Sequence, residues 1–192
     1  MARVYLAGPE VFRPDAAAEG ERLRAICAGH GLSAIYPLDG GSAEDHALGI
    51  RARCILGLRA ADAVVANISP FRGAHMDPGT AWEIGFAQAR GLPVFLWSCD
   101  PRPMAERIPA ADGDGTPRDA DGHLIEDFGQ PENLMIAPPG TPVHASPEAA
   151  IAAAAHHIEL AGKLRIGLLP KILIALAAAW AAGMLAQLFF RH

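Results

Sequence analysis

The hydrophobic positions of the chain form short apolar runs that alternate with longer segments of helical periodicity. The run AVVANI (63–68) is almost continuously apolar, which is typical of a strand buried on both faces of a parallel sheet. We predict strands at 3–8, 33–38, 63–68, 93–98 and 133–137. The spacing and the Gly and Pro boundaries predict helices over 15–29, 43–60, 79–90 and 146–161.

Strands that alternate with helices predict an α/β domain in which helices cover both faces of a parallel sheet. We expect a flavodoxin-like (Rossmann-like), doubly wound sheet of five strands. In such sheets a ligand binds beyond the carboxyl ends of the strands, where the strand order reverses, here between the first and third strands. The loops AGPEVF (7–12) and NISPFRG (67–73) should form this crevice, beside the start of the 79–90 helix.

Two segments depart from this alternation. Residues 99–133 are rich in Pro, Gly and Asp and predict a long irregular excursion. Residues 172–190 are apolar except for Gln187, and a helix of that length would span about 28 Å, close to the thickness of a bilayer core. We therefore predict a catalytic domain at 1–161 and an extra hydrophobic C-terminal helix in 162–192. That helix is either a membrane anchor, with the catalytic domain on the cytoplasmic side, or a helix buried between subunits.

Composition narrows the functional classes. The chain has 192 residues, 51% of them hydrophobic, and a net charge of −5, which argues against a nucleic-acid-binding surface. Its three cysteines and eight histidines have no metal-binding spacing, so we expect neither a metal site nor a cofactor. Few and scattered cysteines favour a reducing, cytoplasmic setting.

The segment MDPGTAWEIG (76–85) contains two acids, Asp77 and Glu83, at the start of a predicted helix. Asp77 followed by Pro78 is typical of a helix cap, but Thr80 and Glu83 also match a capping box. Both patterns cannot begin the same helix, so one acid is left without a structural role.

An acid held one turn inside a helix is rigid, and the helix N-terminus favours its ionised form. Such a carboxylate suits a nucleophile in glycosyl transfer, which passes through a cation-like transition state. A second acid nearby, such as Asp62 at the edge of the third strand, could deliver a proton to the leaving group.

Five segments in the same order resemble the nucleoside 2-deoxyribosyltransferases. They are VYLAGPEVF (4–12), YPLDGG (36–41), ADAVVANI (61–68), DPGTAWEIGFAQARGLPVF (77–95) and RDADGHLIEDFGQPENLMI (118–136). The resemblance covers about 1–161 and implies exchange of the base of a deoxyribonucleoside, in two steps and with retention. It implies nothing about 162–192.

The resemblance also implies residue roles. Glu83 matches the glutamate that forms a covalent deoxyribosyl-enzyme, Asp77 the neighbouring acid, and Asp62 the acid that protonates the departing base. The substrate-binding positions implied are Tyr5, Gly8, Phe12, Gly79 and Asn133. Asn133 matches an asparagine that reaches the site of a neighbouring subunit, which implies a homo-oligomer with shared sites. The expected partners are nucleosides and free nucleobases.

Several alternatives stay open at this point. Tyr5 could be a core residue, Asp62 could cap a strand turn, and Asn133 could satisfy a loop backbone. The same acids would serve a hydrolase of nucleosides or of their 5′-monophosphates, for which Arg13 and Arg72 are candidate phosphate ligands. A membrane-tethered nucleotide sensor without turnover is a third interpretation.

Overall fold

The computed structural model of the protein describes residues 1–41, 46–111 and 116–164. The chain divides into two units, Met1–Ala155 and His156–His192, and the unit Met1–Ala155 contains every strand described below. The predicted apolar span 172–190 lies outside the described residues. Among the helices that are described, none combines the length and the hydropathy that crossing a membrane requires.

Five parallel strands form the sheet, in the order β2-β1-β3-β4-β5. The strands are β1 (Arg3–Ala7), β2 (Ser33–Ile35), β3 (Ala63–Asn67), β4 (Val94–Trp97) and β5 (Val143–His144). The order reverses between β1 and β3, whose register pairs Tyr5 with Val64 and Leu6 with Val65. The predicted flavodoxin-like, doubly wound sheet is confirmed, and its ligand crevice is expected beside the loops that follow β1 and β3.

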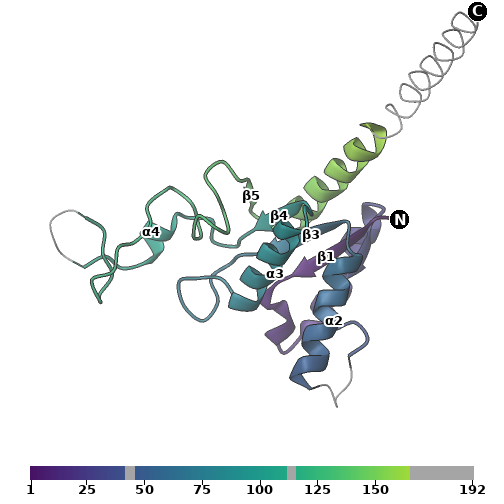
Figure 1. The fold of residues 1–192 in the computed structure, drawn as a ribbon, viewed down its shortest axis with the longest axis horizontal. Helices are drawn as coiled ribbons and strands as arrows, with labels where there is room; N and C mark the ends of the chain where they lie inside the picture. The colour runs from purple at the N-terminus through teal and green to yellow at the C-terminus, as the bar shows by residue number, and fades with distance from the viewer. Residues whose placement is uncertain (42–45, 112–115, 165–192) are drawn as a thin grey trace, which may run out of the picture. The chain divides into compact units, whose positions relative to one another are not determined.

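Helices cover both faces of the sheet. Figure 1 shows α2 (Ala47–Ala60) and α3 (Pro78–Ala89) beside β1 and β3, and their contacts agree with that view. Tyr5 of β1 points to this face, where it packs in a cluster with Leu58 of α2 and Ile84 of α3. Because side chains alternate along a strand, Leu6 points to the other face, where it lines a pocket with Leu23 of α1 (Ala16–Gly29) and with Pro147 at the start of the last helix.

One predicted strand is wrong. Residues 133–137 form turns. The side-chain oxygen of Asn133 accepts a hydrogen bond from the Met135 amide (3.0 Å), and the backbone carbonyl of Asn133 accepts one from the Ile136 amide (2.8 Å). These local bonds compete with strand pairing. The fifth strand is instead the two-residue β5, which pairs with β4 through Leu96 and Val143.

Two short helices complete the order of elements. The 3-10 helix η1 (Pro9–Phe12) directly follows β1, and α4 (Met104–Arg107) interrupts the predicted irregular excursion. Residues 99–133 therefore hold little regular structure where they are described, as the composition predicts.

Candidate active site

Asp77 begins helix α3. Its carboxylate accepts hydrogen bonds from the backbone amide of Thr80 (2.8 Å) and from the Thr80 hydroxyl (3.0 Å), and Pro78 occupies the first helical turn. Because the Thr80 hydroxyl is used in this way, the alternative capping box with Glu83 does not form. Asp77 is the structural cap, and Glu83 is left without a capping role.

Glu83 forms a close hydrogen bond with Tyr5, across 78 residues of sequence. The Tyr5 hydroxyl donates to Oε1 of Glu83 at 2.6 Å. Tyr5 is completely buried on β1, and Glu83 projects from α3, which packs on the same face of the sheet. The strand and the helix therefore hold the two side chains in a fixed relative position.

Burial controls the protonation of this pair. The pKa of Glu83 is raised to about 7, mainly because burial removes water from the carboxyl; the Tyr5 hydrogen bond opposes this rise, and the nearby charge of Asp77 adds to it. The helix N-terminus was expected to keep Glu83 ionised, but burial outweighs that effect. Burial and the charge of Glu83 also raise the pKa of Tyr5, so its hydroxyl stays protonated and remains a hydrogen-bond donor.

Helix α2 fixes the other side of Tyr5. A Cβ placed on Gly57 would lie 2.9 Å from Cε2 of Tyr5, so only glycine lets the ring approach this closely. The Cys54 thiol, one turn earlier on α2, also hydrogen-bonds to Tyr5. Nothing in the local sequence distinguishes Cys54 or Gly57 from the other positions of the predicted 43–60 helix.

Asp62 does not lie in the predicted crevice. It directly precedes β3, at the amino edge of the sheet, where its carboxylate accepts a hydrogen bond from the Arg3 amide (2.8 Å). In a parallel sheet that edge is opposite the carboxyl ends at which ligands bind. The expected location of Asp62 beside the leaving base is corrected, and the alternative role in the strand turn agrees with its contacts.

The predicted loop residues lie at the carboxyl edge. Phe12 is 56% exposed and its ring stacks on Phe71 of the loop after β3, with 5.5 Å between ring centroids. A Cβ on Gly8 would lie 2.0 Å from a carboxylate oxygen of Glu10, and one on Gly79 would lie 3.0 Å from the Asp77 carboxylate. Both glycines therefore leave room for an acidic side chain.

Glu10 is a buried acid that sequence reasoning missed. It is 6% exposed and accepts a hydrogen bond from the Asn67 amide, while the Asn67 carbonyl oxygen accepts from the backbone of Ser69 (2.8 Å). Burial raises the pKa of Glu10. The one available signal was an acid inside the otherwise apolar AGPEVF segment, and Asn67 and Ser69 serve the loop after the third strand as expected.

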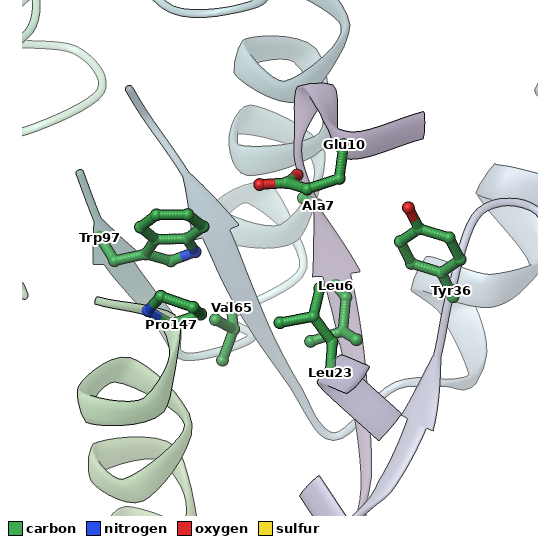
Figure 2. A pocket seen from close by; sticks show the side chains of 8 residues that line it. All are labelled: Leu6, Ala7, Glu10, Leu23, Tyr36, Val65, Trp97 and Pro147. Carbon is green, nitrogen blue, oxygen red and sulfur yellow. The ribbon is translucent and has the colours of Figure 1, made fainter. Parts of the chain in front are cut away.

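A pocket beneath Glu10 is distinct from the Tyr5–Glu83 pair. Figure 2 shows Glu10 at its upper edge, with Leu6, Val65 and Trp97 below. Because Leu6 and Tyr5 point to opposite faces of the sheet, this pocket opens on the α1 face and Glu83 does not line it. The close Tyr5–Glu83 contact, rather than this pocket, identifies the candidate site.

Asn133 bonds to residues of the 99–133 excursion. Its side-chain amide donates a hydrogen bond to Glu126. Next to it, the buried carboxylate of Glu132 accepts from the Met76 amide (2.7 Å), and Arg107 donates to the Ala74 carbonyl (2.6 Å). The 99–133 excursion therefore stabilises, through these hydrogen bonds, the loop that precedes Asp77.

Three potential metal ligands, Asp119, Asp121 and His123, lie within 4.8 Å of one another. The Asp119 carboxylate already accepts from the backbone amides of Asp121 (3.0 Å) and His123 (2.9 Å). A local turn explains this geometry, so we assign no metal to it.

The fold and the acids can now be compared with known proteins. The family model for nucleoside 2-deoxyribosyltransferase matches residues 4–135, which is more than half of the chain. The chain belongs to the nucleoside 2-deoxyribosyltransferase family. The family acts on nucleosides and nucleobases, and its fold is the one described above.

Individual relatives agree with this family assignment. The structure of a 2-desoxiribosyltransferase from Leishmania mexicana is 39% identical, with a TM-score of 0.72, and the match covers 82% of this chain and 99% of that one. An uncharacterized protein of Schizosaccharomyces pombe is 31% identical over 69% of this chain and 74% of its own length. The function of this chain is therefore deoxyribosyltransferase-like.

Proposed function

We propose that the protein transfers a 2-deoxyribosyl group between nucleobases through a covalent intermediate on Glu83, with retention. A Glu83 carboxylate oxygen would attack the anomeric carbon as the bond to the departing base breaks, and the departing base would take up a proton from water. The incoming base would then lose a proton to water, attack the same carbon and release Glu83. Two successive inversions at one carbon give net retention.

The Tyr5–Glu83 hydrogen bond is the observation that carries this proposal. A nucleophile must be held still and must be ionised when it attacks. The 2.6 Å contact holds the carboxylate, and a pKa of about 7 gives both a charged and a neutral form near neutral pH. Asp77, which caps α3, is close enough to Glu83 to raise its pKa, in agreement with the neighbouring acid that the family resemblance implies.

The test is base exchange between deoxyadenosine and a free pyrimidine, followed by chromatography. Glu83→Ala should abolish exchange, and a 2-fluoro-arabinosyl nucleoside should add one sugar to Glu83 of the intact enzyme, detected by peptide mass spectrometry. Exchange retained in Glu83→Ala would exclude the proposal. Product formed equally well without an acceptor base would identify hydrolysis instead.

The proposal extends to a homo-oligomer in which Asn133 binds the sugar in a neighbouring subunit's site. The segment that contains Asn133 exposes several large apolar side chains: Leu124 is 65%, Phe128 57% and Met135 71% exposed. Exposed apolar residues of this size support a protein interface. Asn133→Ala should therefore weaken nucleoside binding, although in its own chain the Asn133 side chain bonds to Glu126.

A further inference from the structure

Two aromatic rings join the loops at the point where the strand order reverses. Phe12 belongs to η1, which follows β1, and Phe71 belongs to the loop after β3. Their rings are stacked, with 5.5 Å between centroids and 19° between planes. Phe12 is more than half exposed, so the pair forms an aromatic surface at the edge of the sheet where a ligand is expected.

Arg72 completes this surface. Its guanidinium lies 4.6 Å from the centroid of Phe71 and 5.2 Å from that of Phe12. Its backbone is left-handed, with φ 54°, a conformation that costs free energy in a residue with a side chain and often marks a functional site. The hydrogen bond from the Phe71 amide to the His75 carbonyl (2.7 Å) closes the loop around it.

The charge of Arg72 is available to a ligand. In the described part of the chain, no carboxylate forms an ion pair with Arg72. Arg13, the other cation of these loops, is held by Asp15 through two hydrogen bonds of 2.8 Å each. Arg13 is therefore already paired, whereas Arg72 lies above an aromatic surface.

The chemistry of this surface selects a particular ligand. Aromatic rings stack on planar heterocycles, and a guanidinium offers only donors, arranged as a fork. A 6-oxopurine presents two adjacent acceptors, O6 and N7, to such a fork, whereas adenine presents an amino donor in place of O6. We propose that Phe12, Phe71 and Arg72 form a nucleobase subsite in which Arg72 selects 6-oxopurines over 6-aminopurines. This inference rests on the proposed deoxyribosyl transfer.

The experiment compares 2′-deoxyinosine with 2′-deoxyadenosine as base donors for the full-length chain. The intact enzyme should prefer deoxyinosine in kcat/KM by about tenfold or more, the discrimination expected of one bidentate contact. Arg72→Gln should reverse or abolish the preference, because a glutamine amide suits the edge of adenine. Arg72→Lys, which keeps the charge but loses the fork, should reduce it.

Arg90→Gln is the matched control. Arg90 also lies over a phenylalanine ring, 5.8 Å from the centroid of Phe86, but at the C-terminal end of α3. Arg90→Gln should leave the preference for deoxyinosine over deoxyadenosine unchanged. Equal preference in the intact enzyme and Arg72→Gln, or a preference of the intact enzyme for deoxyadenosine, would overturn the inference.

Binding separates the subsite from the reaction. Dissociation constants of the same two nucleosides, measured by calorimetry on the Glu83→Gln background, report base selection without turnover. If the intact enzyme exchanges no base, the proposed function fails, but the ratio of these constants still tests Arg72. Loss of affinity for 5′-monophosphates alone on Arg72→Gln, whatever the base, would show a phosphate contact and overturn base selection.

Discussion

At the residue scale, burial and hydrogen bonding act in opposite directions on the carboxyl of Glu83. Burial raises its pKa to about 7, and the Tyr5 hydroxyl limits that rise because it stabilises the ionised form. Below this pKa most of the carboxyl is neutral and a poor nucleophile. We therefore expect kcat/KM to increase with pH through about 7 and then level off, provided that Glu83 is the nucleophile.

Tyr5→Phe should shift the midpoint of this pH profile to higher pH. Removing the hydroxyl takes away the one interaction that lowers the pKa of Glu83, so less of the carboxyl is ionised at a given pH. We expect kcat/KM at neutral pH to fall about tenfold, with partial recovery at higher pH. The measurement is the pH dependence of base exchange.

Tyr36→Phe provides the control for this variant. The Tyr36 hydroxyl is also buried, but it donates to the Ala16 carbonyl (3.2 Å), so its loss should leave the midpoint unchanged. If the pH midpoint shifted equally in both variants, or shifted to lower pH in Tyr5→Phe, then Tyr5 would not be the hydrogen-bond donor that lowers the pKa of Glu83.

At the scale of elements, three segments converge on one side chain. Strand β1 supplies Tyr5, α3 supplies Glu83, and α2 packs against the Tyr5 ring through Gly57. Glycine inside a helix destabilises it by roughly 1 kcal/mol relative to alanine. The close approach of the Tyr5 ring explains why α2 contains glycine at this position.

Gly57→Ala and Gly85→Ala should therefore have opposite effects. A methyl group on Gly57 would displace Tyr5 or Ile35, so we expect exchange to fall about tenfold with no gain in stability despite the better helix former. No atom lies within 4 Å of a Cβ on Gly85 of α3, so that variant should gain about 0.5–1 kcal/mol and keep its activity. Thermal unfolding and exchange rates test both variants. Full activity in Gly57→Ala would show that the position of Tyr5 is not critical.

At the scale of the whole molecule, the proposed homo-oligomer would combine residues of two chains in one site. Asn133 bonds to Glu126 in its own chain and not to the Tyr5–Glu83 pair, while Leu124, Phe128 and Met135 of the same segment are exposed. A shared site would account for both features, because an oligomer would cover the apolar residues and bring Asn133 to a neighbour.

Mixing two inactive variants tests the shared site. Glu83→Ala and Asn133→Ala each lack one half of it, and subunit exchange should restore about a quarter of the activity, since about one site in four then combines both intact residues. Separately refolded variants, assayed without mixing, are the control. Absence of recovery in a mixed oligomer of confirmed composition would exclude a shared site.

Local pattern was enough to predict most elements of the domain. The run 63–68 corresponds to β3 (Ala63–Asn67), and the helix predicted over 79–90 corresponds to α3 (Pro78–Ala89), which begins with the Asp-Pro signal, one of the two starts that the sequence left open. These features depend on neighbours a few residues apart, so the sequence contains their physical cause. The prediction failed at 133–137, where a single asparagine side chain redirected the backbone into turns.

The sequence by itself determined the alternation of strands and helices, and that Asp77 and Glu83 cannot both cap one helix, because periodicity and capping act locally. The structure decided which of the two acids is the cap, since the Asp77 carboxylate accepts from the Thr80 amide. Only the tertiary structure paired Glu83 with Tyr5, raised its pKa by burial and put Asp62 at the opposite edge of the sheet. These facts depend on contacts between residues that are distant in the chain and on the exclusion of water, and neither quantity is encoded in any short segment.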